Sequence, residues 1–461
     1  DLILYNIGTL VTSRELDKAD FDNGMENIEI LKNAYLAVAD GKILEIGIGN
    51  IPENLKSEWT KLVDIEKKVV TPGIVDSHTH LVHYGSRENE LPLKLKGVPY
   101  LEILRNGGGI LSTVRATRKA TRYELFDKAY EVLNRMLCFG VTTVESKSGY
   151  GLDLENEIKQ LEVNKKLNEK HPIDIVSTFM GAHAIPEEFK GNSKGYVEEV
   201  IRMLPIIKEK KLAEFCDIFC EDEVFSVEES RKILNAAKKY GYMLKIHADE
   251  IVSLGGGELA GEVGAVSSEH LMAVSDEGIK SLKENGVIAD ILPATSFNLG
   301  KSYAPVRKMI NEGVDIAIST DYNPGSCPTE NIQLVMQICS SQLRMTPVEI
   351  FKAVTLNGAR AVRRENSIGS LEIGKKADII ILNSDTIHSL PVIDPVANIV
   401  YAMGSENIES SMCNGRWLMK NREILFLDEK ELLKKIKIQN EKIMNKAGVV
   451  IPNRFPVIEI D

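Results

Sequence analysis

Histidines gather where predicted strands give way to loops. His78 and His80 stand two residues apart in the motif His-Thr-His, at the end of the apolar segment 74–80. Side chains at positions i and i+2 share one face of a strand, so both imidazoles can reach one ion. Neutral imidazole nitrogen is a ligand for Zn, Fe or Ni. Such a pair is weak evidence by itself, because surface strands also contain it by chance.

Other predicted strands end in further candidate ligands. Five of the eight histidines take such positions, and Asp321 closes the last strand. We therefore interpret His78, His80, His247 and Asp321 as one metal site. Three imidazoles and a carboxylate leave a coordination position for water, whose pKa a bound cation lowers toward ~7. Both Zn and Fe accept this donor set, so we expect one Zn²⁺ or Fe ion per subunit.

Residues beside these ligands are candidates for proton transfer. Glu250 follows His247 by three residues, and a carboxylate next to an activated water can take its proton. Alone, Glu250 would more simply be a solvated loop acid. His270 could polarise a carbonyl or orient the water, although a hydrogen-bonded core histidine fits as well. We interpret Asp249 and Glu269 as structural groups or as acceptors for the second ring N–H of a ligand histidine.

An alternating pattern of strands and helices must position these residues. From about residue 69, apolar segments alternate with amphipathic ones, and several of the latter end at glycine, as helices do. Eight such units predict a closed (β/α)8 TIM-like barrel, whose functional residues come from the carboxyl ends of its strands. An open, doubly wound sheet is the rival, but its first strand normally leads into a Gly-rich phosphate loop. The predicted strands are 74–80, 141–147, 173–183, 216–220, 243–247, 265–270, 287–292 and 314–321.

Both ends of the chain resemble a sheet more than a barrel. Asp40-Gly41 is a tight-turn dipeptide between apolar segments, which predicts a hairpin of 34–38 with 42–46. Residues 13–30 predict a solvated loop, and the charged stretch 428–446 a terminal helix. Further strands are predicted at 379–382, 399–402 and 417–419. The predicted division is 1–68 and 366–461, which build one small β-sandwich module with a terminal helix, and 69–365, the barrel.

Composition excludes several classes of partner. The chain has 461 residues and a net charge of −11, which argues against nucleic acid because phosphate binding requires clustered Lys and Arg. No uncharged apolar run approaches the roughly 18–20 residues of a membrane span. The cysteines show no CxxC spacing, which favours reduced thiols and a cytoplasmic location. Lys147 is interpreted as a buried partner of Glu145. No lysine ends the fourth strand, so a lysine-bridged pair of metals is not expected.

Longer motifs surround the candidate residues. They are Pro-Gly-Ile-Val-Asp-Ser-His-Thr-His at 72–80, Gly-Gly-Gly-Ile at 107–110, Lys-Ser-Gly-Tyr-Gly at 147–151, Phe-Met-Gly-Ala-His at 179–183, His-Ala-Asp-Glu at 247–250 and Thr-Asp-Tyr-Asn-Pro-Gly-Ser at 320–326. Over roughly 69–382 the sequence resembles the amidohydrolase superfamily and, within it, the imidazolonepropionase family. The resemblance implies hydrolysis of a small anionic molecule, 4-imidazolone-5-propanoate, to N-formimidoyl-L-glutamate in histidine degradation. It also points to a homodimer.

The resemblance implies a role for each matched residue. The substrate carries a propionate, and the planar guanidinium of Arg87 suits a carboxylate, although alone Arg87 would more simply form a surface ion pair. Tyr100 is a weaker candidate as its helper. Backbone N–H groups near Gly325 are further candidate donors. The implied substrate contacts are Arg87, Tyr150, His183, Glu250, Asn323, Gly325 and Ser326.

A hydrolytic mechanism follows as a hypothesis. Water, deprotonated with help from Glu250 or Asp321, attacks the ring carbonyl, and His270 with the metal stabilises the oxyanion. The C–N bond then breaks and the ring nitrogen takes a proton. His183 either holds the ring or carries that proton, and both roles stay open.

Two alternatives remain at this point. The segments 394–402 and 413–416 look more like the tail of amidohydrolase deaminases, so a deaminase of an aromatic heterocycle with the same metal set is the first. A deaminase has no need of Arg87 or of the loop 147–151. A non-enzymatic scaffold barrel is the second. It predicts lost ligands, whereas every ligand position is filled.

Overall fold

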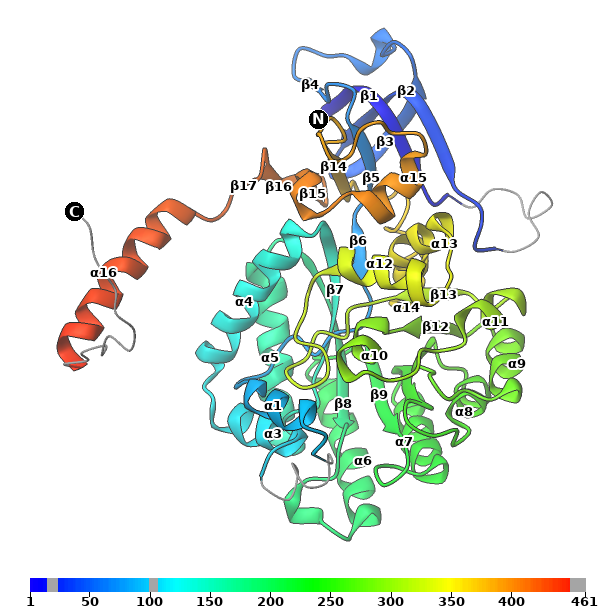
Figure 1. Cartoon of the computed structure of the whole chain (residues 1–461), viewed down its shortest axis with the longest axis vertical. Coiled ribbons are helices and arrows are strands. Elements are labelled where there is room, and N and C mark those ends of the chain that lie inside the picture. The colour runs from blue at the N-terminus through cyan, green and yellow to red at the C-terminus, as the bar shows by residue number, and fades with distance from the viewer. Residues whose placement is uncertain (15–23, 99–106, 448–461) are drawn as a thin grey trace.

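Parallel strands form a closed barrel at the centre of the molecule. The computed structural model describes residues 1–14, 24–98 and 107–447. Within these ranges an eight-stranded parallel sheet runs in chain order, and its two edges meet where His80 N–H donates to the carbonyl of Tyr322 at 2.9 Å. The predicted (β/α)8 barrel is therefore confirmed (Figure 1). Its strands are β6 (Ile74–Asp76), β7 (Val141–Lys147), β8 (Asp174–Ala182), β9 (Phe215–Cys220), β10 (Met243–Ala248), β11 (Ser267–His270), β12 (Ile288–Ile291) and β13 (Ile316–Ile318).

Helices connect the strands on the outside of the barrel (Figure 1). Local sequence sets their ends: Thr121 and Glu124 form a capping box at the start of α4, and Gly286 adopts φ 64° directly after α9. The helices between the strands and after the barrel are α1 (Leu91–Leu95), α3 (Ile110–Lys119), α4 (Arg122–Cys138), α5 (Leu154–Lys170), α6 (Ser193–Glu209), α7 (Val227–Lys239), α8 (Gly256–Val263), α9 (Asp276–Asn285), α10 (Pro293–Leu299), α11 (Val306–Asn311), α12 (Ile332–Gln342), α13 (Pro347–Lys352) and α14 (Gly358–Ala361).

Both chain ends join in one module beside the barrel, as predicted. In the described part of the chain it is a nine-stranded sheet, in which the N-terminal β1 pairs with β5 and β5 pairs with β14 from the C-terminal region. Asp40 and Gly41 both have positive φ (48° and 75°), which the tight turn between β2 and β3 requires. The strands are β1 (Leu2–Thr12), β2 (Glu29–Ala39), β3 (Lys42–Ile48), β4 (Lys61–Asp64), β5 (Val69–Pro72), β14 (Ile379–Leu382), β15 (Ile408–Cys413), β16 (Arg416–Lys420) and β17 (Glu423–Ile424).

One predicted strand is wrong. Residues 399–402 lie in the helical segment Asn398–Ala402, which continues from α15 (Pro395–Ala397). Asp394 starts this helix, because its side chain accepts hydrogen bonds from the N–H groups of Val396 and Ala397 at 2.8 and 3.1 Å. Proline at the first helical position supports the same start. The Asp-Pro pair thus outweighs the β-branched residues that follow it.

The predicted solvated loop at 13–30 is only partly exposed. Among its described residues, Ser13, Met25 and Asn27 are buried, and Asn27 accepts a hydrogen bond from Lys352 at 2.6 Å. Residues 15–23 lie outside the described ranges. The described part around Asn27 therefore packs against α13.

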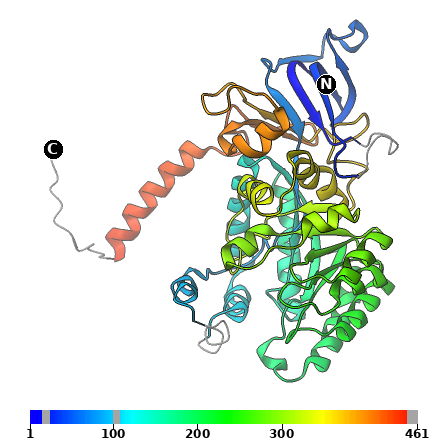
Figure 2. The same cartoon turned by 45° about the vertical axis from the view of Figure 1, so that its right-hand side comes forward.

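The terminal helix is confirmed as α16 (Glu429–Ala447), which extends away from both the barrel and the module (Figures 1 and 2). None of the described helices is long and apolar enough to cross a membrane. The sheet of the module includes β5, so it extends past the predicted boundary at residue 68. The division into domains otherwise stays a prediction.

Candidate functional site

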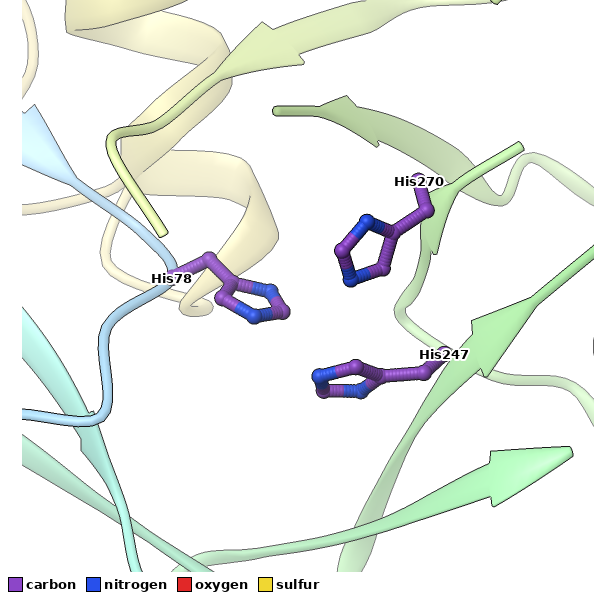
Figure 3. A group of neighbouring side chains, drawn as sticks. All are labelled: His78, His247 and His270. Atoms are coloured by element: carbon purple, nitrogen blue, oxygen red, sulfur yellow. The ribbon is translucent and has the colours of Figure 1, made fainter. Parts of the chain in front are cut away.

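Imidazoles and a carboxylate converge at the carboxyl ends of the barrel strands. Two groups of donor atoms lie within 4.8 Å of one another. The first consists of one ring nitrogen each from His78, His247 and His270, and the second of one donor atom each from His78, His80 and Asp321. Figure 3 shows the rings of His78, His247 and His270 pointing toward one another from three separate segments. His78 belongs to both groups. All the predicted ligands are therefore in one place, and His270 adds a further nitrogen.

The donor atoms of this cluster have the character of metal ligands. Both ring nitrogens of His78 and of His247, Nδ1 of His80 and Nδ1 of His270 are buried, with no hydrogen-bond partner among the described residues. Leaving a buried polar atom unsatisfied costs about 1–3 kcal/mol, so a group of them calls for a ligand. Burial lowers the pKa of the His247 imidazole to about 3, which keeps its ring neutral and able to bind a cation. The residues fit an ion bound by imidazole and carboxylate.

Two of the clustered residues have strained backbones. His270 has φ 70° at the last position of β11, and Asp321 has φ 54° three residues after β13. Residues other than glycine rarely adopt such angles, and each costs of order 1–3 kcal/mol. Asp321 is held in place by the hydroxyl of Thr295, which donates to Oδ2 at 2.5 Å. Oδ1 is left 3.5 Å from Nε2 of His78.

Glu250 lies beside this cluster. Its Oε2 is 3.7 Å from Nε2 of His270, and its side chain is 15% exposed. Burial, followed by the charges of Asp321 and Glu221, raises the pKa of Glu250 to about 8. Burial also raises the pKa of Asp321 to about 7. Carboxyl groups with pKa values near neutrality can both take up and release a proton at physiological pH.

The loops after β7 and β8 place Tyr150 and His183, respectively, against the ligands. The imidazole of His183 stacks on that of His80, with ring centres 4.6 Å apart, and its Nδ1 donates to the carbonyl of Gly149 at 3.1 Å. A Cβ on Gly149 would stand 2.8 Å from this Nδ1, so only glycine permits the approach. Tyr150 is 2% exposed, and its ring centre lies 5.2 Å from that of His183. Both predicted contact residues therefore face the candidate site.

Arg87 is half-buried and forms its ion pair largely inside the protein, not at the surface as its neighbours alone suggest. Its side chain is 10% exposed, and Nε donates to Oε2 of Glu90 at 3.2 Å. The other oxygen of Glu90 accepts a hydrogen bond from the N–H of Gly109 at 2.7 Å, which connects the segment 107–110 to Arg87. The guanidinium also lies against Gly325, in the loop after β13.

The loop after β13 differs from expectation in one respect. The N–H groups of Gly325 and Ser326 both donate to Oδ1 of Asn323 at 2.8 Å, and Nδ2 of Asn323 donates to the hydroxyl of Ser326 at 2.8 Å. These two N–H groups are therefore occupied within the loop. Asn323 thus shapes the loop. Gly325 borders the site as a small residue, and Ser326 borders it with its side chain.

Some functional positions escape sequence reasoning or lie outside the described ranges. Tyr100 falls in 99–106, outside the described residues. Asp217 approaches Nδ1 of His247 at 3.1 Å, but its place in the middle of β9 gives no signal in one sequence. Glu157 accepts hydrogen bonds from three N–H groups of the Tyr150 loop, those of Gly149, Gly151 and Leu152. A helical glutamate ten residues after Lys147 could be suspected only from the need to satisfy that loop.

Asp249 and Glu269, predicted to be structural or to support the ligands, divide between those roles. The carboxylate of Asp249 accepts hydrogen bonds from the N–H groups of Leu254, Gly255, Gly256 and Gly257 at 2.8–3.1 Å, so it shapes the turn into α8. Glu269 Oε2 instead lies 3.5 Å from Nδ1 of His247 and 3.7 Å from Nδ1 of His78.

Comparison with known proteins defines the class. The model of the amidohydrolase family matches residues 69–418. Solved structures agree in fold: a zinc-containing adenosine deaminase from Xanthomonas campestris covers 96% of this chain and 99% of its own, with a TM-score of 0.69 and 16% identity. Atrazine chlorohydrolase from Arthrobacter aurescens matches with a TM-score of 0.70 and 17% identity, and the match covers 95% of this chain and 99% of its own. The chain belongs to the amidohydrolase family.

Sequence similarity narrows the family further. Imidazolonepropionase from Fusobacterium nucleatum subsp. nucleatum is 57% identical over 421 residues, which are 91% of this chain and 99% of that protein. The imidazolonepropionases of Alkaliphilus metalliredigens (51% identical, 92% of this chain, 99% of that protein) and Treponema denticola (48%, 92% and 100%) match over similar lengths. Within the amidohydrolase family, the chain thus belongs to the imidazolonepropionases, which makes it a hydrolase.

Proposed function

We propose that this chain hydrolyses 4-imidazolone-5-propanoate to N-formimidoyl-L-glutamate, a step of histidine degradation. One observation carries the proposal beyond sequence identity. A cluster of buried, unpartnered imidazole nitrogens and a half-buried arginine, Arg87, both border the mouth of the same barrel. The first suits an ion that activates water, and the second suits the propionate of the substrate.

His78, His80, His247 and Asp321 are the proposed ligands of one Zn²⁺ or Fe ion per subunit. When bound, this ion supplies a Lewis acid that lowers the pKa of water and polarises a carbonyl. The shared position of His78 in both clusters supports a single ion. His270 also has a nitrogen within ligand range of His78 and His247, but its Nε2 faces Glu250 at 3.7 Å. We therefore assign to His270 a contact with the reacting carbonyl of the substrate and not a place among the metal ligands.

Glu250 is the proposed proton carrier. Its raised pKa favours uptake of a proton from water, and its Oε2 lies beside His270 at the edge of the cluster. Asp321 is the weaker candidate for this role, because Oδ2 already accepts from Thr295 while Oδ1 faces His78 and His80. Neutral His270 donates a hydrogen bond to the oxyanion that develops as the ring carbonyl is attacked.

Arg87 binds the propionate, with Glu90 fixing the orientation of its guanidinium. Tyr150 and Ser326 contribute hydroxyl donors, while Asn323 and Gly325 shape the loop after β13 that borders the site. Burial lowers the pKa of His183 to about 3, so this ring is neutral in the free enzyme. With Nδ1 donating to Gly149, its other nitrogen is an acceptor, which suits holding an N–H of the imidazolone ring better than delivering a proton.

A direct assay tests the function. Freshly generated imidazolonepropionate should be consumed by the purified protein, with N-formimidoyl-glutamate as the product and about one ion per chain by metal analysis. Ammonia release from purines or pyrimidines, without turnover of the imidazolone, would instead establish the deaminase alternative. An intact protein without bound metal and without turnover would revive the scaffold alternative.

We also propose a cytoplasmic homodimer. The cysteines support the location, because Cys216, Cys220, Cys327, Cys339 and Cys413 are buried free thiols. Exposed apolar side chains on α16, namely Leu433, Ile436 and Ile438, support association, since α16 extends from the body of the chain (Figure 2). An isolated amphipathic helix gains most of its stability from packing its apolar face.

A further inference from the structure

Charged side chains fill the barrel interior directly behind the ligand cluster. The interior of such a barrel is normally packed with branched apolar residues. Here a group of five charged residues from four of the strands, joined to one another by ion pairs, lies there with side chains that are 0% exposed. They are Glu145 and Lys147 on β7, Asp217 on β9, Lys245 on β10 and Glu269 on β11, and we call them the buried ion lattice.

Lys147 lies at the centre of the buried ion lattice. Its Nζ is 2.7 Å from Oδ2 of Asp217, 2.9 Å from Oε1 of Glu145 and 3.5 Å from Oε2 of Glu269. Burial alone would lower the pKa of Lys147, but these three carboxylates raise it overall, so the side chain stays an ammonium. Lys245 contacts the other carboxylate oxygen of Glu269, with Nζ 3.1 Å from Oε1.

The same carboxylates reach the histidines of the metal site. Oδ2 of Asp217, which accepts from Lys147, is also 3.1 Å from Nδ1 of His247. Oε2 of Glu269 is 3.5 Å from Nδ1 of His247 and 3.7 Å from Nδ1 of His78. These contacts do not meet hydrogen-bond geometry, but a carboxylate beside Nδ1 favours the proton on that nitrogen by its charge, which leaves Nε2 to bind a cation.

Stability alone does not account for the buried ion lattice. Replacing buried ion pairs by apolar residues of similar volume is often neutral or stabilising, because burying each charge is costly. When all five of its groups are ionised, the lattice has one net negative charge behind the ligands. That excess favours a cation at the histidines.

We propose that Lys147 is a positioning residue for the metal ligands, acting through Asp217 on His247 and through Glu269 on His78. This proposal rests on the metal site of the proposed function. Lys147 holds each carboxylate at the Nδ1 side of its histidine and compensates their mutual repulsion. The ligand rings are thereby oriented before an ion arrives.

Metal affinity of the purified protein tests the proposal without relying on activity. The variants are Lys147→Met, which removes the ammonium, and Asp217→Asn, which keeps the shape of the side chain. Lys352→Met is the matched control, because Lys352 is 1% exposed but donates to Asn27, outside the buried ion lattice. Each metal-free protein is titrated with Zn²⁺ against a competing chelator, and with Co²⁺ to record its visible spectrum.

We expect Lys147→Met and Asp217→Asn to weaken Zn²⁺ binding by about 10- to 100-fold and to change the Co²⁺ spectrum, as the ligand rings lose their orientation. Lys352→Met should leave both unchanged. Should Lys147→Met not fold, the double variant Lys147→Met/Asp217→Asn removes one charge of each sign and should still bind weakly. Wild-type affinity and spectrum in folded lattice variants would overturn the proposal. Absence of Zn²⁺ binding by the wild-type protein would instead overturn the metal site itself.

Discussion

The guanidinium of Arg87 packs directly on the backbone of Gly325. A Cβ placed on Gly325 would stand 2.1 Å from Nη1 of Arg87 and 2.4 Å from Cζ. Arg87 follows the first barrel strand and Gly325 the last, so the two meet where the barrel closes. Glycine is needed here for close approach and not for an unusual backbone angle, since its φ is outside the left-handed region.

Gly325→Ala should therefore displace Arg87 and impair substrate binding. A shift of about 1 Å in a positioning group can cost ~10²-fold in rate, so we expect kcat/KM for imidazolonepropionate to fall by up to about 100-fold, mainly through KM. Steady-state kinetics measure this. Gly24→Ala is the control, because a Cβ there meets only Asp315 at the ordinary distance of 3.6 Å. Equal kinetics for the two variants would contradict the role of the contact.

Glu250→Gln should separate proton transfer from metal binding. The amide keeps the shape of the side chain but cannot accept the proton of water, so kcat should fall by roughly 10²- to 10⁴-fold. Metal content should stay at the wild-type level, because Glu250 is not among the proposed ligands. Glu228→Gln, at a side chain that is 81% exposed, provides the control for a lost carboxylate. Near wild-type kcat with metal retained would exclude Glu250 as the proton carrier.

Removal of residues 429–461 tests whether α16 supports a homodimer. Deleting the helix removes the exposed apolar side chains of Leu433 and Ile436, so the truncated chain should become monomeric while the full chain remains dimeric. Light scattering coupled to size-exclusion chromatography gives the mass of each. In the full chain, Ile436→Lys should have the same effect, and Lys434→Gln should not. A truncated chain that remains dimeric would place the interface elsewhere.

The positions of the metal residues could be predicted because one rule governs them. Parallel barrel strands bring their carboxyl ends to one face, so His78, His247 and Asp321 had to converge if the barrel was correct. Strand periodicity supported that barrel, and the predicted range 141–147 coincides with β7. The site followed from topology, without knowledge of any contact.

The parts that escaped prediction depend on contacts between segments distant in sequence. Asp217 gains its meaning from His247 and Lys147, which lie on other strands. The N–H groups of Gly325 and Ser326 were expected to face the substrate, but the side chain of Asn323, two residues before Gly325, occupies both. Both facts become visible only when the contacts and hydrogen bonds of the folded chain are known.

Asp378 should give the folded protein a distinct dependence on pH. This residue directly precedes β14 and is 4% exposed, and burial raises its pKa from 3.8 to about 7 although the N–H of Asn414 donates to it at 2.7 Å. The folded chain therefore holds this proton more tightly than the unfolded chain. The resulting stabilisation is fully present below about pH 4 and is lost as pH rises through about 7.

Asp378→Asn should remove this dependence, because the amide keeps the acceptor for Asn414 but does not ionise. Relative to wild type, the free energy of unfolding of the variant should rise between pH 5 and pH 8, with a limiting slope of about 1.4 kcal/mol per pH unit. Urea unfolding of metal-free protein at several pH values measures it, with the exposed Asp385→Asn as control. If wild type and Asp378→Asn run parallel from pH 5 to 8, the carboxyl group is not neutral in the folded chain. The charge of Lys376, which lowers the pKa of Asp378, would then outweigh the effect of burial.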